Sequence, residues 1–406
     1  MVEPLREIEA LVEFDGRSPG SDAERRAAAH LAGRLEALGR EAVIEPIRVR
    51  PSYPLAHIMH ALLAIVGSVV AVYSPLAGAA LVLIAALSTF GDLTGSFFLL
   101  RRLTPQRASQ NVVSRDGDDK PGLLVLIAHY DAARTGLVFS RRVLERTATL
   151  SKTIRRPLGR FGPFFWSMVV ILGCCLVRLI GIKDLPLTAV QFAATVILIL
   201  SVPLLADIAL SDVVPGANDN ASGVSTVLRL AERFGGSLQH FDLMVLLPGA
   251  GEGFLLGMRD WIRRHRKELD QSSTVFLNVD TVGHGTVRWE SKAGFIFPLA
   301  YHPTLVGLCQ ELAEEHSARG VVSREISDSY AARSAGFPAI SIGCLNAMDY
   351  VPTYHQHSDA PEAIDPEALE RAEAFCADLI EAIDERVGAD LVRTGAETVL
   401  SEEETV

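Results

Sequence analysis

The sequence predicts an α/β fold in which a mostly parallel central sheet is sandwiched by helices. Four short apolar runs are rich in Val, Ile and Leu and are bounded by Gly, Pro or polar residues, as strands buried on both faces tend to be. Helical stretches are expected between these runs, and strands that alternate with helices favour a parallel sheet covered on both faces. The expected strands are 122–128, 242–248, 274–279 and 338–343, and the expected helices are 222–234, 255–267 and 303–315.

Five side chains of metal-binding types follow the ends of apolar runs: His129, Asp219, Glu252, Asp280 and His355. In open parallel sheets, ligands collect beyond the carboxyl ends of the strands, so a folded sheet can gather these residues into one site. Zinc accepts imidazole nitrogen and carboxylate oxygen, and a catalytic zinc site leaves one position open for water. Paired metals share the work of polarising a carbonyl and activating that water. The pattern predicts a hydrolase with two zinc ions.

Taken one at a time, these residues have ordinary structural explanations. A His-x-Asp segment after a strand is often a surface turn, and Asp219 lies among Asn, Ser and Gly residues that commonly form turns and helix caps. Glu252 has the place of an acid in the first turn of a helix. His357 is expected to be a solvated or rim histidine. The zinc interpretation depends on all five residues occurring together at strand ends.

Two pairs of long apolar segments account for the high hydrophobic content of the chain, which has 406 residues, 49% of them hydrophobic. The mean hydropathy is +0.25. The segments are 55–73 with 76–91, and 164–182 with 187–206. A helix needs roughly 20 apolar residues to cross a bilayer, so the second segment is short unless it continues through Asp92 toward Leu100. We expect two inserted transmembrane helical hairpins, with buried core helices or a hydrophobic cap on a soluble domain as the alternative.

Charges around the two pairs predict the orientation in a membrane. Basic residues lie on the sheet-domain side of both pairs, whereas the turns at the other end carry only Lys183, with Arg178 just inside. The positive-inside rule then places the sheet domain on the cytoplasmic side of a cell membrane, with its basic residues near anionic lipid headgroups. These residues are Arg48, Arg50, Arg101, Arg102, Arg107, Arg141, Arg142, Arg146, Lys152, Arg155, Arg156 and Arg160.

The remaining composition limits the function classes. A net charge of -11 argues against a nucleic-acid-binding surface, and no nucleic-acid partner is expected. The chain opens with a charged, amphipathic segment, so no signal peptide is expected. The five cysteines have neither zinc nor disulfide spacing, which fits the cytoplasmic side.

The motifs around the five candidate ligands resemble those of the co-catalytic zinc aminopeptidases, the family of bacterial leucyl aminopeptidases, glutamate carboxypeptidase II and the transferrin receptor ectodomain. The resemblance covers about 5–50, 108–136 and 212–385, and it leaves both apolar pairs as insertions. The segment 16–21, followed by a helix, also resembles the opening of that family. The motifs are His129-Tyr130-Asp131, the segment 215–223, Gly251-Glu252 with Gly257, the segment 278–280, and Tyr354-His355 with Asp359.

The resemblance implies a role for each of these residues. Asp219 would bridge two zinc ions. One ion would also take His129 and Asp280, and the other Glu252 and His355. Asp131 would fix the tautomer of the His129 imidazole, and Asp359 would have a similar role beside His355.

One position departs from the family pattern. The metal-binding glutamate of the family is normally preceded by a second glutamate, the general base toward the zinc-bound water, and that position is Gly251 here. General-base assistance is typically worth about 10² to 10⁴ in rate, so its loss cripples catalysis without abolishing it. A carboxylate restored at this position is expected to need only a rotamer that points at the metals, with no change of fold.

These observations predict one zinc-peptidase-like domain made of 1–50, 104–140 and 212–390. A first membrane hairpin would occupy 53–103, a basic segment with the second hairpin 141–211, and an acidic tail 391–406. The expected function is that of a membrane-anchored zinc aminopeptidase, which acts on the amino terminus of a peptide or protein. The alternative is a catalytically impaired, metal-binding pseudopeptidase that binds peptides or organises a membrane partner. Zinc content measured together with hydrolysis of aminoacyl reporter substrates separates the two.

Overall fold

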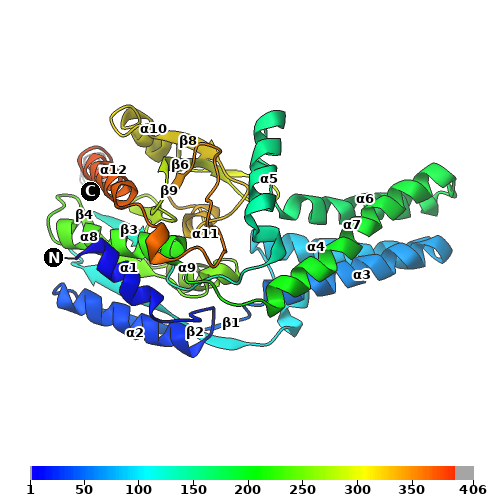
Figure 1. Cartoon of the computed structure of the whole chain (residues 1–406), viewed down its shortest axis with the longest axis horizontal. Helices are drawn as coiled ribbons and strands as arrows, with labels where there is room; N and C mark the ends of the chain where they lie inside the picture. The colour runs from blue at the N-terminus through cyan, green and yellow to red at the C-terminus, as the bar shows by residue number, and fades with distance from the viewer. Residues whose placement is uncertain (1, 389–406) are drawn as a thin grey trace, which may run out of the picture.

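A nine-stranded sheet forms the centre of the computed structural model, which describes residues 2–388 (Figure 1). The strand order is β1-β2-β4-β3-β5-β9-β6-β7, and β8 pairs with β6. The strands are β1 (Val43–Val49), β2 (Arg107–Asp116), β3 (Gly122–Ile127), β4 (Phe241–Leu247), β5 (Thr274–Val279), β6 (Thr286–Ala293), β7 (Leu299–Ala300), β8 (Arg319–Val322) and β9 (Ala339–Leu345). The predicted acidic tail lies outside the described residues.

The sheet is mixed, which corrects the prediction of a mostly parallel sheet. The neighbours β4, β3, β5 and β9 are parallel, and they correspond to the four predicted strands. At one edge β2 pairs antiparallel with β4 and with β1, and at the other β6 pairs antiparallel with β9 and with β7. β3, β4 and β5 are buried along their whole length, whereas β1 exposes most of its residues. The continuous apolar pattern therefore predicted only the parallel centre of the sheet.

Helices flank the sheet in two groups. Helix α8 (Gly223–Phe234) packs against β3, β4 and β5 and against α12 (Pro366–Ala382), with α1 (Pro4–Val12) beside it. Helix α9 (Leu256–His265) packs against β2 and against α11 (Asp328–Ser334). Two further helices are α2 (Asp22–Ala37), which packs on β2, and α10 (Pro303–Glu311), which ends earlier than predicted. This arrangement confirms a central sheet flanked by helices.

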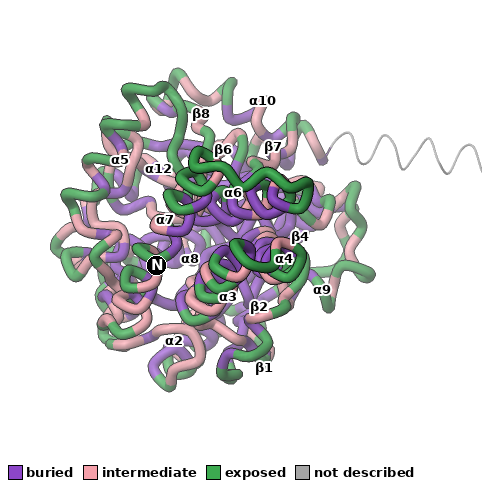
Figure 2. The backbone as a smooth tube through the Cα atoms, turned by 90° about the vertical axis from the view of Figure 1, so that its right-hand side faces the viewer, coloured by how far each residue is buried: buried purple, intermediate pink, exposed green. Residues whose placement is uncertain are grey.

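Four apolar helices form a bundle that projects from the sheet domain (Figure 1). They are α3 (Tyr53–Tyr73), α4 (Pro75–Thr94), α6 (Phe161–Leu179) and α7 (Leu185–Leu210), and each is long and apolar enough to cross a membrane. The second helix continues past Asp92 to Thr94 and so has the length that the predicted segment lacked. Seen end-on in Figure 2, the bundle is buried inside and exposed outside.

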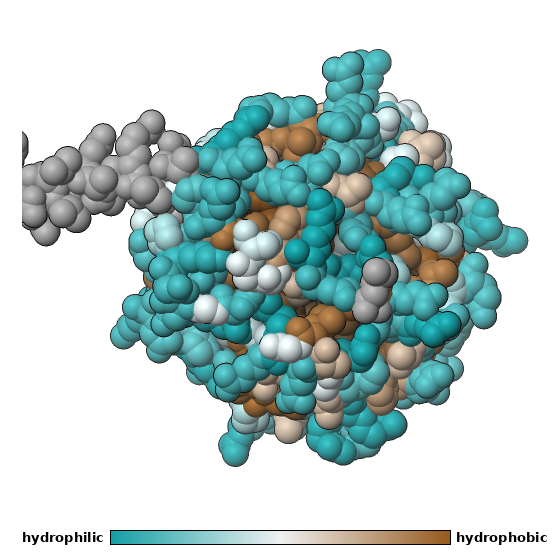
Figure 3. Space-filling view, turned by 90° about the vertical axis from the view of Figure 1, so that its left-hand side faces the viewer, coloured by the Kyte–Doolittle hydropathy of each residue, from teal (hydrophilic) through white to brown (hydrophobic). Residues whose placement is uncertain are grey.

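Small residues pack the helices of the first hairpin together, and polar contacts join the two hairpins. A Cβ atom on Gly78 of α4 would lie 2.4 Å from the Cβ of Ala71 on α3, so only glycine allows these helices to approach so closely. Between hairpins, Ser68 Oγ and Thr195 Oγ1 are 2.7 Å apart, and the Gln191 amide donates to the Ser68 carbonyl at 2.7 Å. The outer faces carry exposed apolar side chains such as Val66, Val69, Leu83 and Ile199. By contrast, the face of the sheet domain away from the bundle is mostly hydrophilic (Figure 3).

Candidate metal centre

The predicted ligands come together beyond the carboxyl ends of the parallel strands. His129 follows β3 and Asp280 directly follows β5, while Glu252 follows β4 in the short helix η4 (Gly251–Gly253). Asp219 lies in η3 (Ala217–Ser222) just before α8, and its peptide bond to Asn220 is cis. His355 comes from the loop after β9. His129, Asp219 and His355 are all buried.

Asp219 lies between the two histidines. Its Oδ1 is 3.5 Å from His129 Nε2, and its Oδ2 is 3.4 Å from His355 Nε2. His355 Nε2 is also 3.3 Å from Glu252 Oε2. Two ligands that each lie about 2.1 Å from a tetrahedral ion are about 3.4 Å from one another. The spacing of these atoms is therefore the spacing of zinc ligands, longer than that of good hydrogen bonds.

Buried atoms without hydrogen-bond partners support the fit of a metal. Within the described residues, Asp219 Oδ2 and both ring nitrogens of His355 make no hydrogen bond. Leaving such groups buried and unpaired is costly, and a cation in the space between them would satisfy them. Imidazole nitrogen and carboxylate oxygen are ligands that zinc accepts.

The pKa values of the buried acids among the predicted ligands also support the fit of a metal. Burial raises the pKa of Glu252 and raises the pKa of Asp280 to about 7. Burial alone would also raise the pKa of Asp219, but its electrostatic interactions with the neighbouring His129 and His355 hold that pKa below its ordinary value. Asp280 interacts electrostatically with His129, Asp219 and Glu252. Several acids crowded in a buried site are most stable when a cation shares the space.

Asp131 lies behind two of the predicted ligands. Its Oδ1 is 3.5 Å from His129 Nδ1, and this nitrogen makes no hydrogen bond within the described residues. The same carboxylate accepts hydrogen bonds from the backbone N–H groups of Gly251 at 2.8 Å and Glu252 at 3.0 Å. One buried carboxylate thus fixes the turn that carries Glu252 and lies beside the His129 imidazole.

Asp359 supports a different ligand from the one expected. Its carboxylate accepts hydrogen bonds from the backbone N–H groups of Asn218 at 2.8 Å and Asp219 at 3.0 Å, so it positions the Asp219 turn rather than the His355 ring. Buried Arg17, from the opening segment, donates to the carbonyls of Tyr130 and Gly216. Arg17 therefore ties the His129 turn to the Asp219 turn. His357 is exposed, as predicted.

Gly251 has no room for a side chain, which corrects the expectation that a carboxylate fits there without other changes. A Cβ atom on Gly251 would lie 2.7 Å from the Cβ and 2.8 Å from the Cγ of His129, and 3.1 Å from Asp131 Oδ1. Contacts of this length force the root of the His129 side chain to move. The glycine thus fits the close packing of this turn against a predicted ligand.

The backbone around the site is strained. Of the eight described non-glycine residues with positive φ, five lie at or beside predicted ligands: Ala250, Phe254, Leu255, Thr281 and His355. Left-handed φ is disfavoured for residues with a Cβ and persists where the surroundings fix it, commonly at functional sites. Part of that support is visible at Ala250, whose N–H donates to buried Glu24 at 2.9 Å.

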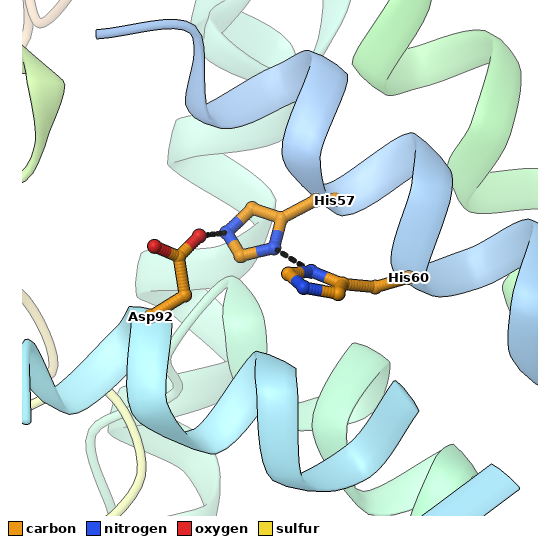
Figure 4. A group of neighbouring side chains, drawn as sticks. All are labelled: His57, His60 and Asp92. Atoms are coloured by element: carbon orange, nitrogen blue, oxygen red, sulfur yellow. Dashed lines mark hydrogen bonds and ion pairs between the residues drawn. The ribbon is translucent and has the colours of Figure 1, made fainter. Parts of the chain in front are cut away.

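A polar network inside the bundle reaches the Glu252 turn, and no sequence pattern predicted it. Asp92 on α4 forms a 2.7 Å ion pair with Arg101, and Arg101 donates to the carbonyl of Gly253 at 2.7 Å. On its other side, Asp92 lies 3.9 Å from His57 Nε2 (Figure 4). Arg101 is buried, so it is not a headgroup-binding residue as the charge pattern had suggested.

The histidines of this network also offer ligand atoms of metal-binding types. Atoms of His57, His60 and Asp92 lie within 4.8 Å of one another. However, the Arg101 guanidinium already neutralises Asp92, and a second cation beside it would be repelled. Three of the four ring nitrogens have partners without a metal, because His60 Nδ1 lies 3.1 Å from His57 Nδ1 (Figure 4) and His60 Nε2 lies 2.7 Å from Ser88 Oγ. His57 Nε2 makes no hydrogen bond within the described residues. The group is a structural relay between helices.

Asp328, at the start of α11, is a further site residue that sequence reasoning missed. It is fully buried, and neither carboxylate oxygen has a hydrogen-bond partner within the described residues. Burial raises its pKa to about 7, and it interacts electrostatically with His129, Asp280, Asp131 and Glu252. In the sequence it follows Ser327 before a short helix and looks like a capping residue, so only the fold reveals its position.

Comparisons with known proteins agree with this geometry. Residues 201–380, which contain four of the five predicted ligands, match peptidase family M28. No curated protein sequence matches the chain. Among solved structures, a glutaminyl cyclase from Porphyromonas gingivalis superposes with a TM-score of 0.53 at 13% identity, covering 93% of this chain and 96% of that one.

Two peptidase structures are similar to the same degree. A Zn-dependent exopeptidase from Parabacteroides distasonis has a TM-score of 0.53 and 12% identity, with 94% of this chain and 97% of that chain covered. A leucine aminopeptidase precursor from Bacteroides thetaiotaomicron has a TM-score of 0.52 and 14% identity, with 93% and 95% covered. At these identities the structures show a shared fold. Residues 201–380 therefore match peptidase family M28, and the shared fold supports the resemblance of the motifs to those of co-catalytic zinc aminopeptidase-like proteins.

Proposed function

We propose that this protein is a membrane-anchored zinc metallopeptidase that hydrolyses peptides from the amino terminus. Asp219 would be shared by two zinc ions, one held with His129 and Asp280 and the other with Glu252 and His355. The observation that carries the proposal is the placement of Asp219, whose two oxygens face different histidines at 3.5 and 3.4 Å. A single ion would not require the two oxygens to be directed apart in this way.

The chain's own residues would hold and orient the reacting groups. When bound, the zinc ions would polarise the scissile carbonyl and supply an activated water. Asp131 and Asp359 hold the ligand turns through backbone hydrogen bonds, and Arg17 ties two of those turns together. A fixed ligand geometry is what such chemistry needs, and loss of a supporting carboxylate typically lowers metal affinity about 10- to 100-fold.

The four apolar helices would anchor the protein in the membrane, with the sheet domain on the cytoplasmic side. Support comes from the bundle, whose outer face is apolar, and from the exposed basic residues at its base, among them Arg142 and Arg146. The substrate partner would be the amino terminus of a peptide or protein, and membrane lipid would surround the bundle.

Metal analysis of matched variants tests the zinc assignment. We expect Asp219→Asn to lose more than one equivalent of zinc from the detergent-purified protein, because its carboxylate would serve both ions. His357→Ala is the control, since this exposed histidine lies two residues from a predicted ligand and faces solvent. Equal zinc loss in the two variants, or wild-type protein that binds no zinc, would contradict the proposal.

A second candidate function is favoured by Gly251. With glycine where the family has its base, and with no space for a side chain there, the protein would bind peptide ends without rapid cleavage. Hydrolysis of a panel of aminoacyl reporters distinguishes the two functions. An N-terminal glutamine reporter belongs in the panel, because glutaminyl cyclases share the fold. Zinc-loaded protein that cleaves none of the reporters supports the binding function.

A further inference from the structure

A cavity of about 160 Å³ adjoins the candidate zinc site. Gly251, Glu252 and His355 form part of its wall, so a group inside it would be next to the predicted reacting centre. An apolar cavity of similar size, about 150 Å³, holds one benzene molecule in another protein. The space is therefore suited to one large side chain next to a scissile bond.

The wall opposite the zinc site comes from the membrane helices. Two phenylalanines of α6 and four residues of α7 line the cavity: Phe161, Phe164, Ser201, Leu204, Leu205 and Ile208. Leu205 and Ile208 are buried, whereas neighbouring Leu204 is 38% exposed on the outer side of the bundle. One helix thus separates the cavity from the lipid-facing surface.

The remaining wall is aromatic, and its charges are paired. Tyr53 stacks on Phe254 with ring centroids 4.6 Å apart, and Phe161 and Phe295 pack against the same phenylalanine. Arg160 lies 3.4 Å from Glu325 and stacks over the Tyr354 ring at 4.4 Å. Because this cation and anion neutralise one another, a charged side chain would lose its hydration here without gaining a partner.

We infer that the cavity receives the first, large apolar residue of a membrane-embedded peptide, whose end reaches the site from the bilayer past α6 and α7. The inference rests on the proposed function and names its substrate class. A peptide confined to the bilayer is concentrated at the height of these helices, whereas a soluble peptide must first carry the same residue out of water to the base of the bundle. The substrate would thus be selected by its location as well as by its side chain.

Matched tryptophan variants on α7 test the cavity. Leu205→Trp and Ile208→Trp place a large ring where the substrate residue would lie. Leu200→Trp makes the same change on the same helix at a residue that is 59% exposed and does not line the cavity. In nanodiscs with zinc, we expect each cavity variant to lower kcat/KM for a leucyl peptide at least about tenfold relative to an alanyl peptide, with bound zinc unchanged. Leu200→Trp should behave as wild type.

Substrate location is tested with two peptides that begin with the same apolar residues. One continues into a transmembrane segment and the other is soluble. We expect the membrane-embedded peptide to be cleaved faster at equal total concentration in nanodiscs. Equal or preferred cleavage of the soluble peptide overturns entry from the bilayer. Cleavage of a lysyl peptide as fast as the leucyl one overturns the selection of an apolar first residue by the cavity. An N-acetylated version of the embedded peptide should not be cleaved, and its cleavage would contradict the aminopeptidase function itself.

Crosslinking gives a readout that does not depend on turnover. A membrane-embedded peptide with a photoreactive leucine at its first position should label α6 and α7 around Phe164 and Leu205 in wild type and in Leu200→Trp. Labelling should be lost in Ile208→Trp. If the protein cleaves no peptide but gives this pattern, the aminopeptidase proposal fails and the binding site stands. If labelling is absent, or is the same in all three proteins, the inference is wrong.

Discussion

At the scale of single residues, the candidate metal centre consists of predicted ligands and of buried groups that support them. His129, Asp219, Glu252, Asp280 and His355 are recognisable because zinc chemistry restricts residue type and because each follows an apolar run. The residues that support these side chains have neither a restricted residue type nor a preceding apolar run to mark them. In the sequence, Arg101 looks like one of the basic residues that flank an apolar segment. Only the fold shows that it donates a hydrogen bond to the Gly253 carbonyl. The structural roles of its partner Asp92 and of Asp328 also depend on contacts between segments that are distant in the sequence.

Gly251→Glu should weaken the site rather than restore a base. The new Cβ would lie 2.7 Å from the His129 Cβ, so we expect His129 to be displaced, with lower zinc content and a loss of about 1–3 kcal/mol in unfolding free energy. Gly251→Ala should show most of the effect, because the clash begins at Cβ. Gly33→Ala on α2 is the control, since nothing lies within 4 Å of the position of its Cβ. A Gly251→Glu protein with full zinc and higher peptidase activity would disprove this reading of the turn.

Asp328→Asn should lower kcat while leaving the zinc content intact. The carboxylate is buried, has no hydrogen-bond partner within the described residues and interacts electrostatically with three predicted ligands. Burial raises its pKa to about 7, which suits a group that takes and returns a proton near neutral pH. If it replaces the missing base, kcat falls by about 10² to 10⁴. Glu290→Gln is the comparison variant, because burial also raises the pKa of Glu290 to about 7, but its carboxylate accepts hydrogen bonds from Tyr301 and Ser327. Equal kcat in the two variants excludes a proton-transfer role for Asp328.

At the scale of elements, the sequence predicted what is periodic and apolar and missed what is short or half exposed. The four parallel strands and both hairpins were predicted close to their observed bounds, because their burial is continuous along the chain. β1 and β8 carry few buried residues, and β7 has only two residues, so no pattern marks them. The mixed character of the sheet comes from β2 and β6, which pair antiparallel with β4 and β9 and were also not among the predicted strands. The same limit applies to one of the links between the bundle and the sheet domain, the ion pair of Asp92 with Arg101.

A double-variant experiment tests whether that ion pair positions the Glu252 turn. Arg101→Met removes one member of a buried pair and should destabilise the protein by about 3–5 kcal/mol, because Asp92 is left unpaired. Adding Asp92→Asn should recover much of that loss. Zinc affinity should stay lowered, by about 10- to 100-fold, because the hydrogen bond from Arg101 to the Gly253 carbonyl is missing in both. Recovery of zinc affinity together with stability would show that Arg101 acts on stability alone.

At the scale of the whole molecule, the bundle and helix α5 (Arg141–Ile154) together suggest how the protein lies in a membrane. The helix runs across the base of the bundle rather than along it (Figure 1). It exposes apolar Val143, Leu150 and Ile154 together with basic residues, a composition typical of a helix at the membrane interface. If the bundle crosses the bilayer, α5 lies at the headgroups on the side of the sheet domain, and the candidate zinc site opens close to that surface.

Cysteine labelling in intact cells tests this orientation. All five native cysteines are buried, so an introduced cysteine should dominate the reaction with an impermeant maleimide. We expect Lys183→Cys, in the turn between α6 and α7, to be labelled from outside, because that turn lies at the far end of the bundle from the basic residues. Arg146→Cys on α5 should be labelled only after the cells are permeabilised. The reverse accessibility would place the sheet domain and its metal site outside the cell, where the positive-inside rule would be violated at both hairpins. Labelling of both positions in intact cells would instead mean that the four helices lie on the membrane without crossing it, because a crossing bundle must separate its two ends.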